Sequence, residues 1–93
     1  MKTIAVSQFC VYHNVPQSFI DSLSNFELID LIEIETTKHI NIKEIDKIEK
    51  LMRLHYDLNV NFEGLDIINN MILEINALQS EIIQLKNKLE LYQ

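Results

Sequence analysis

The sequence predicts a mostly α-helical fold with a helix-turn-helix, a short β-hairpin and a long C-terminal helix. Three observations predict this fold class. A single glycine and a single proline in 93 residues leave few breaks in helical structure. Residues 62–92 carry apolar side chains at helical spacing. Residues 31–41 have the pattern of two short strands joined by a turn.

The C-terminal third contains the most regular pattern in the chain. Its apolar residues are spaced three and four apart in alternation, which is the heptad seam of a coiled coil. The seam consists of Ile68, Met71, Ile75, Leu78, Ile82, Leu85, Leu89 and Tyr92. A helix over residues 62–92 is roughly 45 Å long, so the residues before it cannot cover all of it. We therefore expect a winged domain in residues 1–60, a dimerisation helix in residues 61–93, and a homodimer.

The seam does not fix the direction of the two helices. Glu81 can meet Lys86 across a parallel seam, and Glu74 can meet Lys88 across an antiparallel one. The first part of the seam can also pack on the monomer's own core, which leaves the part from Leu78 onward for a partner.

The N-terminal region predicts a helix-turn-helix. Residues 7–13 form a first helix with Phe9 and Cys10 facing inward, and residues 17–25 form a second. The break between them contains Asn14, which tolerates a left-handed turn, and Pro16, which suits the start of a helix.

A β-wing and a capped helix follow. We expect strands over residues 31–35 and 38–41, joined by a turn at Thr36-Thr37. Asn41 and Glu44 have the spacing of a capping box for a helix over residues 42–56. The expected buried side of this helix consists of Ile45, Ile48, Leu51, Met52 and His55. After a break at residues 57–60, Asn61 is the predicted cap of the long helix.

The charge distribution argues against a phosphate-binding surface. The net charge is −6, and the first 37 residues contain one base, Lys2, against five acids. Contacts to phosphates supply most of the affinity for nucleic acid, so this balance suits a basic protein partner better. We expect no membrane span, because no stretch of 18 apolar residues occurs, and no signal peptide, hence a cytoplasmic protein.

The sequence contains no convincing catalytic or metal-binding group. Cys10, His13 and His55 have no carboxylate that completes a ligand set, and a lone cysteine cannot form an internal disulfide. Cys10 is expected in the core, His13 and His39 in solvent, and His55 at a helix end where it binds the last carbonyl groups. We therefore expect a protein that is not an enzyme and needs no cofactor or metal.

The order of elements resembles that of MerR-like regulators. The runs that carry this resemblance are Ile45–Leu54 and Asn59–Asp66. The chain is still more similar to the chaperone modulators of the CbpM-like branch, through Gln8–Val15 and Arg53–Asp66. Asn14 and Asn59 stand where that branch commonly has a turn glycine, and asparagine tolerates the same backbone geometry. The resemblance implies a regulator that binds the J domain of a DnaJ-like co-chaperone and blocks its work with a DnaK-type chaperone.

Two acidic patches are the predicted binding surfaces for this partner. One lies on the wing and the other around the turn before the long helix, with His55 and Tyr56 as anchors beside the second. The predicted contact residues are Asp30, Glu33, Glu35, His55, Tyr56, Asp57, Glu63 and Asp66. Each of these acids also suits an ordinary solvated surface.

Two other functions remain open at this point. A MerR-like transcription regulator would bind DNA as a dimer, with Lys43, Lys47, Lys50 and Arg53 as its cations. The predicted second helix of the helix-turn-helix lacks Lys and Arg, which argues against this function and makes nucleic acid an unlikely partner. A pure assembly module would act only through its coiled coil.

Overall fold

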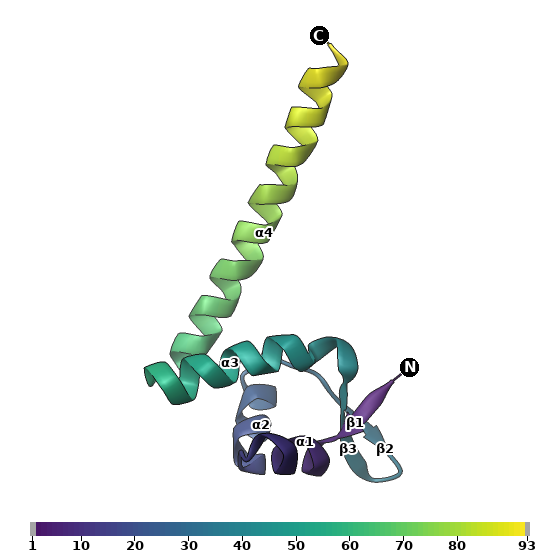
Figure 1. Cartoon of the computed structure of the whole chain (residues 1–93), viewed down its shortest axis with the longest axis vertical. Coiled ribbons are helices and arrows are strands. Elements are labelled where there is room, and N and C mark those ends of the chain that lie inside the picture. Colours follow the sequence, from purple (N-terminus) through teal and green to yellow (C-terminus); the bar gives the residue numbers. More distant parts are fainter. Residues whose placement is uncertain (1, 93) are drawn as a thin grey trace.

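The computed structural model describes residues 2–92, which form a small winged domain and a long helix that projects from it (Figure 1). The elements in chain order are β1 (Thr3–Ala5), α1 (Val6–His13), α2 (Gln17–Asn25), β2 (Leu31–Ile34), β3 (Thr37–Asn41), the 3₁₀ helix η1 (Ile42–Glu44), α3 (Ile45–Leu58) and α4 (Phe62–Leu91). The fold is mostly helical, as predicted.

The first two helices form the predicted helix-turn-helix. Asn14 ends α1 in the left-handed conformation, with φ 56°, and the amide of Val15 donates to the carbonyl oxygen of Cys10 at 3.0 Å. Pro16 then occupies the N-cap position of α2 in extended geometry. Three buried apolar residues of each helix face the core: Val6, Phe9 and Cys10 from α1, and Phe19, Ile20 and Leu23 from α2.

The wing is part of a three-stranded antiparallel sheet with the order β1-β3-β2. The hairpin turn consists of Glu35 and Thr36, both with positive φ, between the paired residues Ile34 and Thr37. The predicted turn at Thr36-Thr37 was therefore wrong by one residue, and Glu35 lies in the turn rather than in a strand. The sheet also contains β1, which pairs Thr3 with Asn41 and adds an edge strand to the wing.

The helix after the wing differs from the prediction at its start. Residues 42–44 form η1, and α3 begins only at Ile45. Asn41 caps η1 by accepting a hydrogen bond from the amide of Lys43 at 3.0 Å. The predicted capping box is wrong, because the Glu44 carboxylate instead accepts from the amide of Asp30 at 3.2 Å. This bond ties the start of β2 to the start of α3.

One core lies beneath α3 and joins the helix-turn-helix to the sheet. Its fully buried members include Ile20, Leu23, Ile40, Ile48 and Leu65. On α3, Ile48 and Leu51 are buried, whereas Ile45, Met52 and His55 are partly buried. The predicted inward side of this helix is therefore confirmed. Its middle residues lie inside the core, and the others lie at the edge of the core.

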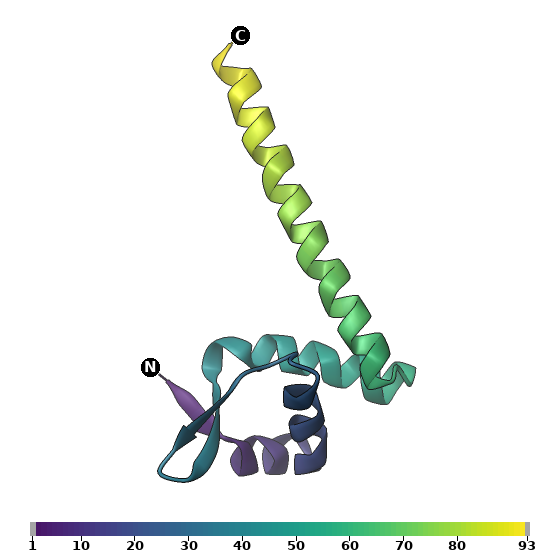
Figure 2. The ribbon, with the colours of Figure 1, turned by 180° about the vertical axis from the view of Figure 1, so that it is seen from behind.

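The long helix α4 leaves the domain after its first two turns. Asn61 caps it by accepting from the amide of Gly64 at 2.8 Å, as predicted. Leu65 is its one buried residue, and every residue from Met71 to Tyr92 is exposed. Seen from both sides, the helix stands away from the domain, and the long axis of the molecule measures 56 Å (Figures 1 and 2). No helix of residues 2–92 has the length and apolarity that crossing a membrane requires.

Candidate partner-binding surface

The predicted contact residues fall into two separate groups at the two ends of α3. The wing patch consists of Asp30, just before β2, Glu33 on β2, and Glu35 in the hairpin turn after it. The turn patch consists of His55, Tyr56, Asp57, Glu63 and Asp66, around the α3–α4 turn. The sheet and this turn lie at opposite ends of α3 (Figure 1). A small partner domain that uses one patch therefore approaches a different side of the molecule from one that uses the other.

The wing patch presents exposed carboxylates that are only partly offset by nearby cations. Glu33 lies opposite Lys38 in the β2–β3 register, so the two side chains are cross-strand neighbours. The ammonium of Lys38, however, lies 3.8 Å from the carboxylate of Asp21 on α2. This contact joins the wing to the second helix of the helix-turn-helix and leaves the wing with an acidic surface.

The turn patch is built on a cluster of stacked rings. His55 packs between Phe19, at a centroid distance of 5.3 Å, and Phe62, at 4.7 Å. The Nδ1 atom of His55 lies 2.8 Å from the carbonyl oxygen of Val60. This contact holds the edge of the imidazole ring, in addition to the packing of the two phenyl rings. His55 lies near the end of α3, as predicted, but the carbonyl oxygen that it contacts belongs to the turn beyond the helix and not to the last turn of α3.

Tyr56 is the more accessible aromatic residue of the turn patch. Its ring is 5.3 Å from that of Phe19, and 47% of the residue is exposed. Partial burial raises the pKa of the phenol, and the nearby Cys10 thiol raises it further. Tyr56 therefore keeps its proton at neutral pH and can offer both an apolar face and a hydrogen-bonding group.

The acids of the turn patch differ in their surroundings. Glu63 is exposed in the first turn of α4, and Asp66 is half-buried one turn later. Asp57 instead borders an open apolar groove of about 510 Å³ between α3 and α4. The groove is lined by Lys50, Arg53, Leu54, Asp57, Leu58, Ile68 and Ile72. Asp57 therefore shares this groove with two cations, Lys50 and Arg53.

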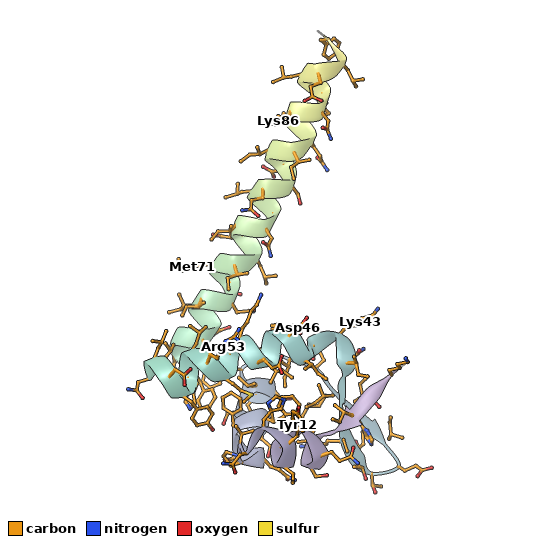
Figure 3. All side chains as sticks on the ribbon, viewed as in Figure 1. Tyr12, Lys43, Asp46, Arg53, Met71 and Lys86 are labelled. Atoms are coloured by element: carbon orange, nitrogen blue, oxygen red, sulfur yellow. The ribbon has the colours of Figure 1, made fainter. Side chains whose placement is uncertain are left out.

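Four of the six lysine and arginine residues in residues 2–60 lie along η1 and α3, and none lies on α2. Spacings of three and four put Lys43, Lys47, Lys50 and Arg53 on one side of η1 and α3. Two carboxylates at the same spacing, Asp46 and Asp57, interrupt this row. Figure 3 labels Lys43, Asp46 and Arg53 along this helix. The exposed positions of α2 carry polar and acidic residues and no lysine or arginine.

Two features of α1 were not predicted. Val11 and Tyr12 are almost fully exposed, although both are large and apolar. His13, expected in solvent, packs at a tilt against Phe9 with ring centroids 4.3 Å apart and places its Nε2 atom 3.6 Å from the carboxylate of Glu49. With Phe9 and Cys10 directed inward, helical geometry turns the next two residues outward, so the exposure of Val11 and Tyr12 could have been inferred from the pattern.

The described residues contain no obvious catalytic or metal centre. Within residues 2–92, no three His, Cys, Asp or Glu side chains are close enough together to hold a metal ion. Cys10 is buried, as expected, and burial followed by the charge of Asp21 raises the pKa of its thiol. A protonated, enclosed thiol is a poor nucleophile.

Comparison with known proteins identifies the family. A search of curated proteins and a search of solved structures each found no significant match. A family model described as "MerR HTH family regulatory protein" matches residues 4–87, which include the helix-turn-helix, the wing and most of α4. Because this match spans nearly all of a chain that also has the expected order of elements, the protein belongs to the MerR family of helix-turn-helix regulatory proteins.

Proposed function

We propose that this protein regulates a DnaJ-like co-chaperone by binding its J domain and blocking its work with a DnaK-type chaperone. The observation that carries the proposal is the contact between Asp21 and Lys38. A DNA-reading protein of this fold needs cations on its second helix and wing. Here the second helix offers a carboxylate, and that carboxylate lies beside the lysine of the wing. The remaining surface favours a cationic partner over a phosphate backbone.

The proposed partner follows from the resemblance to chaperone modulators together with this charge pattern. A J domain presents a basic helix to its acidic chaperone, so an acidic protein can cover the same helix. The wing patch and the turn patch each offer exposed carboxylates for this contact. Tyr56 is 47% exposed and packs against Phe19, which supports the turn patch as an anchor site.

We further propose that the protein acts as a homodimer through α4. The seam residues from Met71 onward are exposed in the single chain, which is unfavourable for a helix with this much apolar surface. The seam also continues into the groove beside α3 through Ile68. A second copy of α4 would cover this surface with matching side chains.

Titration of the full-length protein with the purified J domain tests the main proposal. We expect saturable binding that weakens as salt is raised, because exposed charges contribute to it. The double variant Glu33→Lys/Glu35→Lys tests the wing patch, and Glu63→Lys tests the turn patch. Glu90→Lys, near the far end of α4, is the matched charge control. If the wild-type protein does not bind the J domain even at low salt, the proposal is wrong.

DNA binding is the second candidate, and the row of cations on α3 is the observation that favours it. In a dimer two such rows could contact phosphates, although Asp46 and Asp57 interrupt each of them. A gel-shift assay at low salt with duplex DNA distinguishes the two functions. We expect no retardation, and a salt-dependent shift abolished by Lys47→Ala/Lys50→Ala would support the DNA function instead.

A further inference from the structure

The outer face of α1 presents large apolar side chains that the fold does not use. Val11 is 82% exposed and Tyr12 is 83% exposed, whereas Val6, Phe9 and Cys10 on the other side of the same helix are buried. An exposed aromatic residue beside an exposed β-branched one is unfavourable in water and typical of a contact surface. Among the large apolar residues that the structure describes before α4, the next most exposed is Leu58, at 68%.

Tyr12 lies between two hollows in the surface. One, of about 370 Å³, is lined by Ser7, Gln8, Val11 and Tyr12. The other, of about 260 Å³, is lined by Ile4, Phe9, Tyr12, His13, Ile45 and Glu49. The second hollow is mostly apolar and has the size of one or two aliphatic side chains. The ring therefore forms a ridge that an amphipathic helix could straddle with side chains on both sides.

The charges around Tyr12 favour a cation. α1 contains no lysine or arginine, and Glu49 is the carboxylate at the rim of the second hollow. Its side chain is 41% exposed, and its carboxylate lies 3.6 Å from the His13 ring. The exposed face of Tyr12 can also attract a lysine or arginine through its π electrons. A partner helix with aliphatic and basic side chains on one face could place an aliphatic side chain in the hollow and a basic one beside the Glu49 carboxylate.

We propose that this α1 face, formed by Val11, Tyr12, His13, Ile45 and Glu49, docks a basic amphipathic helix, with Tyr12 as its anchor. The inference rests on the proposed function, and it identifies the apolar part of the contact with the J domain. Exposed ion pairs each contribute about 0–1 kcal/mol, so acidic patches alone make a weak complex. An aromatic side chain that is buried on binding supplies the additional binding free energy that the ion pairs do not.

The location of the α1 face distinguishes it from the turn patch. Ile4 comes from β1, and Ile45 and Glu49 come from the first turns of α3, so the face belongs to the end of α3 that carries the sheet. Helix α1 itself packs against β1 and β3. Glu49 and Asp57 are eight residues apart, which corresponds to about 12 Å along the helix. Substitution of the exposed Tyr12 is therefore expected to leave the turn patch intact.

Titration of full-length variants with the purified J domain tests the inference. Tyr12→Ala is expected to weaken binding about tenfold, as for a typical hot-spot residue, while Tyr12→Phe keeps the ring and retains the affinity. Glu49→Gln should weaken binding less and reduce its dependence on salt. The matched control is Leu73→Ala on α4, which removes exposed apolar surface away from the α1 face and should change nothing. Because Tyr12 is exposed, thermal unfolding of each variant should match that of the wild type.

The outcomes separate this inference from the proposal on which it rests. If the wild type binds the J domain and Tyr12→Ala binds equally well, the α1 face is not the docking surface, although the proposed function stands. If the wild type does not bind, both are wrong. If Tyr12→Ala lowers the mass measured by sedimentation, the face is a contact between two copies of this chain and the inference is overturned.

Discussion

The Nδ1 atom of His55 lies 2.8 Å from the carbonyl oxygen of Val60, across the turn that joins α3 to α4. The amide of Val60 in turn donates to the carbonyl oxygen of Leu54 at 3.1 Å. Residue 60 is therefore held on both sides of its backbone by the last turns of α3. Because α4 begins two residues later, these bonds fix the direction in which the long helix leaves the domain.

His55→Ala should lower the free energy of unfolding by about 2 kcal/mol. The substitution removes one partly buried hydrogen bond and the ring packed between Phe19 and Phe62. Urea denaturation followed by circular dichroism measures the loss. His39→Ala is the control, because the bond of its Nδ1 atom to Thr3 is long, at 3.4 Å, and its removal should cost less. Equal losses for the two histidines would contradict this role of His55.

Gly64→Ala should destabilise the protein by about 1 kcal/mol, although alanine is the better helix former. A Cβ atom at position 64 would lie 2.8 Å from Cγ1 of Val60 and 3.1 Å from the capping oxygen of Asn61. Shortening the side chain of Val60 would relieve this clash. In a Val60→Ala background, Gly64→Ala should become neutral or stabilising, so thermal unfolding of the four proteins of this double-mutant cycle measures the coupling. Additive effects would argue against the contact.

Thr36→Gly should stabilise the wing by about 0.5–1 kcal/mol. Thr36 has φ 65° in a two-residue hairpin turn, a conformation that is costly for a β-branched residue and easy for glycine. The midpoint of thermal unfolding should therefore rise. The matched control is Thr37→Gly, in the strand opposite Ile34, which should lower it because glycine weakens a strand. A lower midpoint for Thr36→Gly would show that the turn has another geometry.

The features that were predicted correctly depend on local sequence. Asn14 and Asn59 both adopt the left-handed conformation at helix ends, and Asn61 caps α4, because these preferences arise from the residue and its neighbours. The heptad pattern likewise predicted the extent of α4 almost to the residue. Local rules failed at the wing, where Glu35 and Thr36 form a turn without glycine or asparagine. There the pairing of Ile34 with Thr37 places the turn at residues 35 and 36.

Features that depend on distant contacts were missed. Residues 3–6 are β-prone by composition, but the place of β1 in the sheet comes from the pairing of Thr3 with Asn41, far along the chain. The position of His13 beside Glu49 also requires α1 to lie across α3. For the candidate surface, the sequence identified acids but could not tell which are offset by cations. The contact of Asp21 with Lys38 became clear only in three dimensions, as did the groove that Asp57 shares with Arg53.

Burial of Cys10 should make stability decrease at alkaline pH. Burial, and secondarily the charge of Asp21, raises the pKa of the thiol above its ordinary value of 9.0. The native state therefore retains a proton that the unfolded chain loses, and the free energy of unfolding falls as pH rises above about 9. Urea denaturation between pH 8 and pH 10 measures this slope. Cys10→Ala should reduce the slope, whatever its effect on stability at pH 7. An unchanged slope would exclude Cys10 as its source.

A charge in the middle of the seam should convert the proposed dimer into a folded monomer. Ile82→Glu places a carboxylate among Leu78, Leu85 and their counterparts in the second copy, where its desolvation would be costly. Sedimentation equilibrium should then give half the mass of the wild type. Since residue 82 is exposed in the single chain, the unfolding of the winged domain should stay cooperative.

Leu73→Glu is the matched control for this substitution, because residue 73 lies on α4 outside the seam and is similarly exposed. It should leave the dimer intact, and a monomer from both variants would mean that the seam is wrongly assigned. The monomeric Ile82→Glu protein also separates two functions. A pure assembly module loses all activity with its coiled coil, whereas a protein that binds the J domain through its winged domain should still bind it, with one partner per chain.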